Sequence, residues 1–402
     1  MKGNFGKECI GFLDKDYSAR ILDSEMSSIQ NKLYVFKNPY VGNKRKLISF
    51  FVPLLNRYNI KFDVFLDLFC GSSFVSMAMK MLNKRVICND ILDSAFLNAL
   101  AFVVNKDMVL TDEEKKFLVT NDDKEPIHLF FNSYKDRFTE NEIWYLNNYH
   151  HNLEILYSSV RSDGLSHMKR SLAFAYLQNY VLEHCFVGGR LSNNQVLAKL
   201  DHRLNHPRNK GREMSFKNIR WTNPIYPNDS NRHQAFGMDA INFLEQLEEM
   251  NKEHKKSGFE ELNPDLCYID PPYGGHQSDY AEMYDFFEGY IYLQSREERE
   301  KILDSYNEEA KLSVKRNLEN KKRFINKKNY REHFDKLINL TAGIKWIAIS
   351  YNNSSWGSID EIHEIVKRYR KRVIIEDFSY SYNYRKKGNR KKIKEYLILA
   401  EE

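Results

Sequence analysis

The apolar residues of this chain gather in two kinds of stretch that alternate along much of its length. Short apolar runs are typical of strands buried on both faces of a sheet, and they occur at 64–69, 85–88, 266–269 and 344–350. Helical spacing indicates helices at 47–55, 74–82, 112–120, 140–160 and 166–187, and a capping box starts a charged one at 295–320. Residues 373–384 and 393–400 alternate as the two strands of an antiparallel hairpin do. Strands that alternate with helices in this way predict an α/β fold with a hairpin near its C-terminal end.

The stretch 105–233 differs in texture from the chain on either side of it. Its first part is mostly helical, whereas 188–231 is polar, rich in loops, and carries arginines among asparagines and glutamines. Arginine and these amides are the side chains that read guanine and adenine edges in the major groove of DNA. The low density of apolar residues predicts a mobile segment that orders on a partner; a solvated loop is the alternative, although a loop of this length is unusual. The candidate DNA-reading residues are Arg190, Arg203 and Arg208.

Composition adds a modest basic charge to this picture. The net charge of +6 over 402 residues fits a polyanionic partner, but many unrelated proteins share such a value. The hydrophobic share of 42% allows a sizeable core in one large domain or two. Five cysteines are scattered without metal-ligand spacing, and no apolar run has the form of a signal peptide or a membrane span. We therefore expect buried thiols in a cytoplasmic protein that has no membrane partner.

The stretch with the clearest chemistry is the loop Asp270-Pro271-Pro272-Tyr273, which ends the apolar run 266–269. Two prolines fix φ and lack N–H donors, so the strand stops and a rigid loop follows at its carboxyl end, where open α/β sheets bind their ligands. A carboxylate, carbonyl oxygens and an aromatic ring suit a planar amine, because the oxygens accept its protons and the ring stacks on its face. The alternative is a turn that merely ends a strand, with Tyr273 packed nearby.

A second candidate site follows the apolar run 64–69. Strand, glycine loop, helix and strand come in this order, with Gly71 in the loop and Asp90 ending the second strand, 23 residues after Asp67 (90 − 67). This βαβ pattern is typical of nucleoside-binding sheets, in which the terminal acid accepts the ribose hydroxyls. The loop lacks the further glycines of a dinucleotide fingerprint, which argues against a pyrophosphate ligand. Taken alone, the stretch fits a generic turn between strand and helix equally well.

A third stretch runs from Tyr40 to Lys44, just before the helix at 47–55. Gly42 and Asn43 signal a turn, with an aromatic residue before the glycine and a lysine after it. The N-terminus of the helix and Lys44 can together hold a carboxylate. Taken alone, the stretch fits a basic loop before an ordinary helix better.

In their order and spacing, these three stretches resemble the adenine-N6 DNA methyltransferases of the Dam-like group, also named the D12 class or alpha group, which use S-adenosyl-L-methionine. The resemblance covers about residues 34–104 and 234–400. It implies a Rossmann-like methyltransferase sheet with a C-terminal antiparallel hairpin and an inserted domain. The units implied are an N-terminal arm (1–32), a catalytic S-adenosylmethionine-binding domain (33–104 and 234–402) and an inserted, mostly helical target-recognition domain that binds DNA (105–233).

The resemblance also implies roles for single residues of the cofactor site. Tyr40 and Lys44 would contact the cofactor near its methionine end, and Asp67 would lie beside the amino group of that end. Asp90 would bind the ribose, and Asp270 would lie between the cofactor and the target base. The implied cofactor-binding residues are Tyr40, Lys44, Asp67, Phe69, Gly71, Asp90, Asp239 and Asp270.

Two further positions bear on this site. The stretch from Phe236 to Leu244 resembles the adenine-contacting motif of the group, in which Asp239 would accept the amino protons of the cofactor adenine. The same residue can be the N-cap of the helix that follows, and one residue can do both. Ser73 stands where many relatives have a second glycine, and a serine is small enough to fit there.

The reaction implied is transfer of a methyl group to N6 of an adenine flipped out of duplex DNA. Asp270 and the Pro271 carbonyl would accept hydrogen bonds from the two amino protons, and the base would stack on Tyr273. The implied catalytic residues are Asp270, Pro271, Pro272 and Tyr273, without a metal. The implied partners are double-stranded DNA and, in a restriction-modification system, a cognate restriction endonuclease, and we expect the protein to be a monomer.

The turn of the predicted hairpin is crowded with cations, which occupy six of the eight positions at 385–392. Such a cluster favours a loop that contacts DNA phosphates, and solubility is the alternative explanation. The candidate phosphate-binding residues are Arg385, Lys386 and Lys387.

Three alternatives to adenine methylation stay open. Cytosine-N4 methyltransferases usually have serine at the first loop position, and RNA or protein amide methyltransferases usually have asparagine, so Asp270 favours DNA adenine. A non-catalytic DNA-binding subunit of the same fold is the alternative outside the enzyme class. The intact cofactor and loop residues argue against it.

Overall fold

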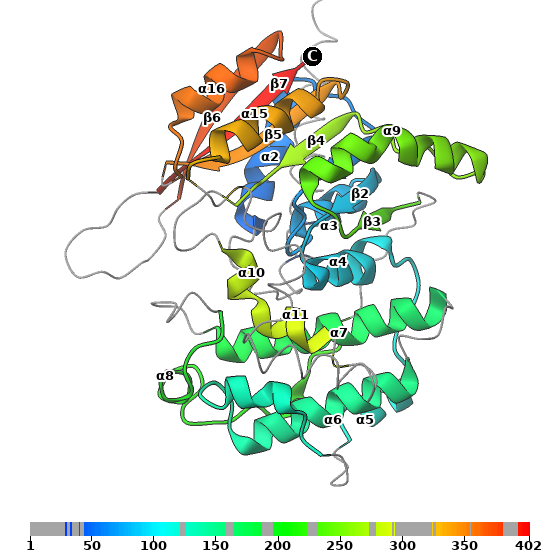
Figure 1. Ribbon diagram of the computed structural model, residues 1–402, viewed down its shortest axis with the longest axis vertical. Coiled ribbons are helices and arrows are strands. Elements are labelled where there is room, and N and C mark those ends of the chain that lie inside the picture. The colour runs from blue at the N-terminus through cyan, green and yellow to red at the C-terminus, as the bar shows by residue number, and fades with distance from the viewer. Residues whose placement is uncertain are drawn as a thin grey trace, which may run out of the picture.

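The computed structural model of this chain places a sheet-containing part above a helical part in Figure 1. The structure describes residues 29, 33, 40, 44–120, 126–157, 164–186, 196–222, 232–272, 279–291, 293, 324, 327–353, 355–380 and 393–402.

Seven strands form one sheet in the order β3-β2-β1-β4-β5-β7-β6. The strands are β1 (Val64–Asp67), β2 (Arg85–Asn89), β3 (Gln234–Phe236), β4 (Leu266–Ile269), β5 (Trp346–Asn352), β6 (Arg372–Tyr380) and β7 (Ile393–Glu401). The first five are parallel to one another, and β7 runs antiparallel to both β5 and β6. The predicted α/β class is therefore confirmed, as are the predicted strands at the centre of the sheet.

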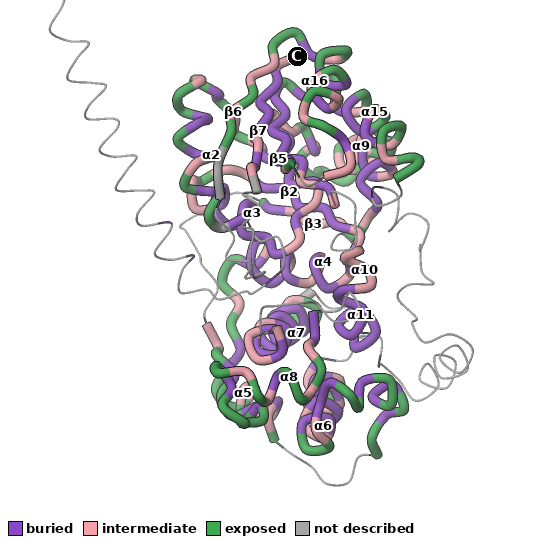
Figure 2. The backbone as a smooth tube through the Cα atoms, turned by 90° about the vertical axis from the view of Figure 1, so that its left-hand side faces the viewer, coloured by how far each residue is buried: buried purple, intermediate pink, exposed green. Residues whose placement is uncertain are grey.

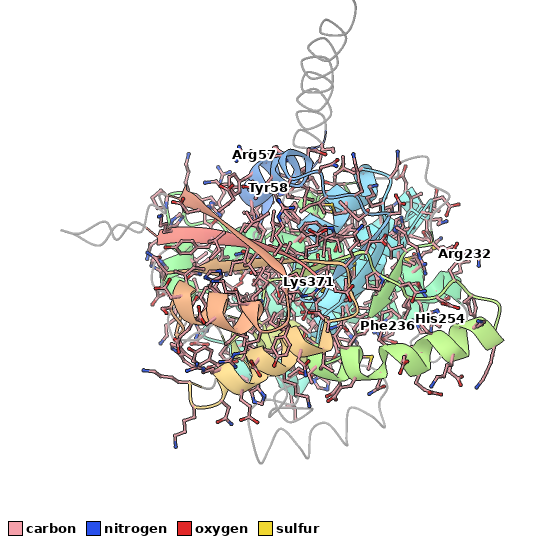
Figure 3. All side chains as sticks on the ribbon, turned by 90° about the horizontal axis from the view of Figure 1, so that it is seen from above. Arg57, Tyr58, Arg232, Phe236, His254 and Lys371 are labelled. Atoms are coloured by element: carbon pink, nitrogen blue, oxygen red, sulfur yellow. The ribbon has the colours of Figure 1, made fainter. Side chains whose placement is uncertain are left out.

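The central strands are apolar because each of them is covered on both faces. Along β4, Leu266 and Tyr268 face one apolar cluster, whereas Cys267 and Ile269 face another. The first face packs on α2 (Arg45–Arg57) and α3 (Phe74–Met81), and the second on α9 (Ala240–Lys256), α15 (Tyr330–Leu340) and α16 (Ile359–Lys367). Figure 3 shows these two layers on opposite sides of the strands. The described cysteines are all buried and free, as predicted.

Helix α2 is fastened at its C-terminal end to the antiparallel edge of the sheet. Arg57, its last residue, forms an ion pair with Glu376 on β6 at 3.5 Å, and the hydroxyl of Tyr58 donates to the same carboxylate. The other end of α2 begins just after Lys44. Helix α2 thus spans the distance between the sheet edge and the carboxyl ends of the parallel strands.

The chain crosses over in opposite directions from the two central strands. From β1 it passes through α3 to β2 on one side, and from β4 it reaches β5 on the other side. The carboxyl ends of β1 and β4 are therefore the topological switch point, where sheets of this kind bind ligands in a crevice.

The helical part lies beneath the sheet in Figure 1, and its apolar core is continuous with the core on the α2 and α3 face. Capping boxes start α5 at Thr111 and α6 at Thr139, as the sequence predicted for the first of these helices. The helical part contains α5 (Asp112–Leu118), the 3₁₀ helix η2 (Leu129–Tyr134), α6 (Glu140–Leu156), α7 (Gly164–Cys185), α8 (Leu200–Leu204) and the 3₁₀ helix η4 (Phe216–Asn218). None of the helices in the described part of the chain is long and apolar enough to cross a membrane.

A short helix that follows the loop after β4 in the sequence also belongs to this helical core. In α11 (Asp285–Ile291), the ring of Phe286 lies 5.0 to 5.6 Å from those of Phe130, Tyr134 and Phe138. The hydroxyl of Tyr290 donates to the Leu146 carbonyl at 2.7 Å. Residues beyond the expected boundaries 105–233 therefore contribute to the helical part.

The polar tract at 188–231 is better packed than its composition suggested. Met214, Phe216 and Ile219 are buried against α6 and α7, and α8 forms within the tract. The predicted mobility is therefore wrong for 196–222, because these few apolar residues anchor it. Arg190, the charged helix expected at 295–320 and the turn of the hairpin lie outside the described residues.

Candidate active site

Three aspartates meet at the carboxyl edge of the sheet because the strands that carry them are neighbours. Asp67 ends β1, Asp90 follows β2, and Asp270 follows β4. In the register of the sheet Asp67 lies opposite Tyr268, so Asp270 lies two residues beyond this pair, just after the end of β4. The sequence placed Asp90 and Asp270 at strand ends, whereas Asp67 lay within the predicted run 64–69, and β1 ends at Asp67. The strand order brings the three acids together.

The carboxylate of Asp67 is buried and incompletely satisfied. Its Oδ2 accepts a hydrogen bond from the Ser76 hydroxyl at 2.6 Å, whereas Oδ1 has no hydrogen-bond partner within the described part of the chain. Burial raises the pKa of Asp67 to about 7; the Ser76 hydrogen bond opposes this shift, and the charges of Asp270 and Asp90 add to it. The site therefore offers an unsatisfied acceptor in negative surroundings, which suits a cationic ligand group.

The glycine loop is tied directly to Asp90. Gly71 has a φ of +47°, a left-handed conformation that favours glycine, and its N–H donates to Asp90 Oδ2 at 2.8 Å. The N–H of Leu92 donates to Oδ1 at 2.9 Å. Ser73 also takes a left-handed conformation, with φ +60°, which gives a physical reason for glycine at this position in relatives. Asp90 thus shapes the loop that contains Gly71.

Tyr40 lies over this loop as part of a group of nearly parallel rings. Its ring is 4.3 Å from that of Tyr284 and 6.3 Å from that of Tyr280, with interplanar angles of 12° and 9°. A Cβ added to Gly71 would lie 3.3 Å from the Tyr40 ring. Burial raises the pKa of Tyr40 well above its ordinary value, so the hydroxyl stays protonated. Tyr280 and Tyr284 belong to α10 (Tyr280–Met283) and the residue after it, so the segment that follows the Asp270 loop lies beside Tyr40 and the loop that contains Gly71.

Lys44, at the N-terminal end of α2, lies beside the carboxylate of Asp270. Its Nζ lies 3.3 Å from Asp270 Oδ1 and 3.5 Å from Glu395 Oε1. Lys44 and Glu395 are buried, and 16% of the Asp270 side chain is exposed. Pro271 is buried and Pro272 half-buried, and Tyr273 lies outside the described residues.

Sequence reasoning missed Glu395. The sequence signal was its alternation along β7, because Glu395 is in phase with the buried Leu397 and Leu399. An acid on the buried face of a strand is costly unless a charged partner meets it.

Two other predicted cofactor residues lie at the same edge of the sheet. Asp239 accepts hydrogen bonds from the N–H groups of Ile241 and Asn242 at 3.1 Å each, so its role as N-cap of α9 is confirmed. It follows β3, whose Phe236 pairs with Asn89 beside Asp90. Phe69 is half-buried in the loop after β1, and the Phe324 ring meets it edge-on at 5.4 Å.

Of the predicted DNA-reading arginines, one is buried, one is exposed, and one lies outside the described residues. The prediction for Arg203 is wrong, because its guanidinium is completely buried and forms two hydrogen bonds with the Glu142 carboxylate. Arg208 is exposed on the helical part, where its guanidinium donates to the Glu183 carbonyl at 3.2 Å. The remaining candidates, Arg190, Arg385, Lys386 and Lys387, lie outside the described residues.

Comparison with known proteins agrees with this arrangement. The family model of the D12 class N6 adenine-specific DNA methyltransferases matches residues 40–326. That match includes Tyr40, Lys44 and the three clustered aspartates. The chain is also 23% identical over 372 residues to the Type II methyltransferase M2.HphI of Haemophilus parahaemolyticus, covering 90% of this chain and 96% of that protein. The chain belongs to the D12 class of N6 adenine-specific DNA methyltransferases.

Proposed function

We propose that the protein transfers the methyl group of S-adenosyl-L-methionine to N6 of an adenine flipped out of duplex DNA. The observation that carries this proposal is the position of Asp270. It lies on a rigid Pro-Pro loop at the crevice between β1 and β4, next to Lys44 and close enough to Asp67 for their charges to interact. Such a carboxylate can accept a proton from an amine that enters the crevice.

The residues around the crevice fit S-adenosylmethionine. Asp67 Oδ1 lacks a partner among the described residues and would accept from the ammonium of the methionine end. Asp90, beside the left-handed Gly71, would bind the ribose hydroxyls, and Asp239 would accept from the adenine amino group of the cofactor. The cofactor supplies an electrophilic methyl group on a sulfonium, so the protein needs no nucleophile of its own.

The work left to the protein is to hold the target amine. Its lone pair is delocalised into the adenine ring, and acceptors for both amino protons help the nitrogen become tetrahedral. Asp270 and the Pro271 carbonyl would accept hydrogen bonds from the two N–H groups. As the bond from N6 to the methyl group forms and the bond from the methyl group to the sulfonium breaks, N6 loses one proton, which Asp270 would accept. Positioning of this kind can supply about 7–11 kcal/mol. Flipping the base costs a few kcal/mol, and stacking on Tyr273 would return about 1–3 kcal/mol.

We further propose that the protein modifies the recognition site of a restriction-modification system. The named relative is a Type II methyltransferase, which supports this role. A cognate endonuclease would then act on the same DNA sequence, and the methyltransferase would work as a monomer in the cytoplasm.

Methyl transfer to defined duplexes tests the proposed reaction. Tritium from labelled S-adenosylmethionine should enter duplexes that contain adenine and should stay out of duplexes built with a base analogue that lacks the exocyclic amine. Label on cytosine in a duplex, or on RNA alone, would contradict adenine methylation of DNA. No label on any nucleic acid under conditions in which both DNA and cofactor bind would support a non-catalytic DNA-binding subunit.

A further inference from the structure

Glu395 on β7 carries a buried carboxylate that none of the roles above explains. It is 4% exposed, and its Oε1 lies 3.5 Å from the Nζ of Lys44. Its Oε2 is buried and has no hydrogen-bond partner among the residues that the structure describes. A buried carboxylate with an unsatisfied oxygen is costly to fold, so its presence beside the active site calls for a physical reason.

The antiparallel strand is what brings Glu395 to the catalytic edge. Glu395 lies opposite Asn352, the last residue of β5, and β5 is the direct neighbour of β4. Lys44 approaches the same point from the start of α2. Three segments far apart in the sequence therefore place Lys44 between the carboxylates of Asp270 and Glu395.

The distances indicate that the two acids share the ammonium. Lys44 Nζ is 3.3 Å from Asp270 and 3.5 Å from Glu395, and both separations exceed the 2.7–2.9 Å that is usual for a full charge-assisted hydrogen bond. If Glu395 did not also attract Lys44, the ammonium would lie closer to Asp270, neutralise its charge and occupy a carboxylate oxygen that the substrate amine needs.

We propose that Glu395 is a positioning residue that holds Lys44 back from Asp270, so that Asp270 keeps both its charge and an acceptor oxygen for the adenine amino group. The inference rests on the proposed function of Asp270. It assigns a role in catalysis to the antiparallel strand β7, whose contribution is otherwise structural.

The test compares single-turnover rates of methyl transfer to an adenine-containing duplex at saturating cofactor. Glu395→Gln keeps an acceptor for Lys44 and removes the charge, and it should lower the rate about 10- to 100-fold, as a displacement of about 1 Å at a reacting group does. DNA affinity and the midpoint of thermal unfolding should stay close to those of the wild type. Glu401→Gln is the matched control, because Glu401 lies on the same strand and forms a surface ion pair with Arg372 at 3.7 Å.

A second arm asks whether Glu395 acts through Lys44. Lys44→Met should lower the rate, and adding Glu395→Gln to it should lower the rate no further, because the ammonium that Glu395 restrains is already gone. If Glu395→Gln proves unstable, Glu395→Asp provides the same test, since it keeps the charge but withdraws it by about one carbon–carbon bond length, roughly 1.5 Å.

The outcomes separate this inference from the proposed function. A wild-type rate in Glu395→Gln, or rate reductions that multiply in the double variant, would overturn the role of Glu395 while adenine methylation by the wild type stands. A wild-type protein that methylates no adenine would overturn the proposed function and this inference with it.

Discussion

At the scale of single residues, the buried carboxyl group of Asp67 makes the stability of the fold depend on pH. Its carboxyl group ordinarily has a pKa near 3.8, and burial raises the pKa of Asp67 to about 7 in the folded protein. Between these two values the folded state holds a proton that the unfolded state has released. The contribution of Asp67 to stability is therefore greatest at low pH and is lost as the pH rises towards 7. A ligand cation beside Asp67 would recover part of this stability.

We therefore predict that cofactor binding is coupled to the ionisation of Asp67. Below pH 7, binding of the cationic methionine end should release a large fraction of a proton, and affinity should rise with pH until about 7. Asp67→Asn should bind weakly and without this proton release. Calorimetry at pH 6 in two buffers of different ionisation enthalpy measures the effect. Equal binding enthalpies in both buffers for the wild type would show that Asp67 does not titrate with the cofactor.

At the scale of elements, strands were predictable and short helices were not. The apolar runs of β1, β2 and β4 follow from burial on both faces, and that requirement is visible in the sequence. Helices α10 and α11 are too short for a period of 3.6 to show. They depend on tertiary contacts that no local pattern reveals.

Part of the site could be predicted because buried strands are visible in the sequence as apolar runs. Asp90 and Asp270 sit where apolar runs end, so their place at one sheet edge follows from the order of parallel strands. Asp67 lies within the apolar run 64–69, and the end of β1 at this residue was not visible in the sequence. Glu395 depends on the antiparallel pairing of β7 with β5, and Arg203 depends on Glu142 from a distant helix. Residue type alone made Arg203 a candidate DNA reader, and burial reversed that interpretation.

We predict that Arg203 stabilises the helical part and reads no DNA. Arg203→Met leaves Glu142 as a buried charge without this partner and should cost about 3–5 kcal/mol of unfolding free energy. Arg208→Met, at an exposed position, should cost less than about 0.5 kcal/mol. Chemical denaturation of the two variants makes the comparison. If Arg203→Met were as stable as Arg208→Met, the buried ion pair would have no structural role.

At the scale of the whole molecule, the candidate active site lies near the segment that connects the two parts. Figure 2 shows α10 and the buried α11 between the sheet and the helices beneath it. From α11, the carboxylate of Glu288 accepts hydrogen bonds from the N–H groups of Asp93 and Ser94, at the start of α4 (Asp93–Ala99). The chain that leaves the catalytic loop thus holds both the helical part and the loop that carries Asp90.

We propose that the basic residues at 385–392 bind DNA phosphates, whereas arginines of the polar tract at 188–231 read base edges. Replacing Arg385, Lys386 and Lys387 by glutamine should weaken binding to all duplexes alike and reduce the salt slope by about one unit for each DNA phosphate that the variant no longer neutralises. Replacing Arg190 or Arg208 singly should cost the specific site about 1–3 kcal/mol if that residue reads a base, and non-specific DNA much less. Affinities for cognate and scrambled duplexes at two salt concentrations distinguish these effects. Loss of discrimination in the triple variant alone would place sequence recognition in the hairpin instead.

The central claim is that Asp270 accepts a proton of the target amine, and the rate of Asp270→Ala tests it most directly. Single-turnover transfer should be followed as N6-methyladenine, by mass spectrometry of the digested duplex. We predict that Asp270→Ala lowers this rate at saturating cofactor by about 10²- to 10⁴-fold, while the fold is retained. Asp63→Ala is the control, because its side chain is 97% exposed just before β1 and should leave the rate unchanged. A rate for Asp270→Ala within about tenfold of the wild type would contradict the account, since that reduction is below the range expected for a proton acceptor.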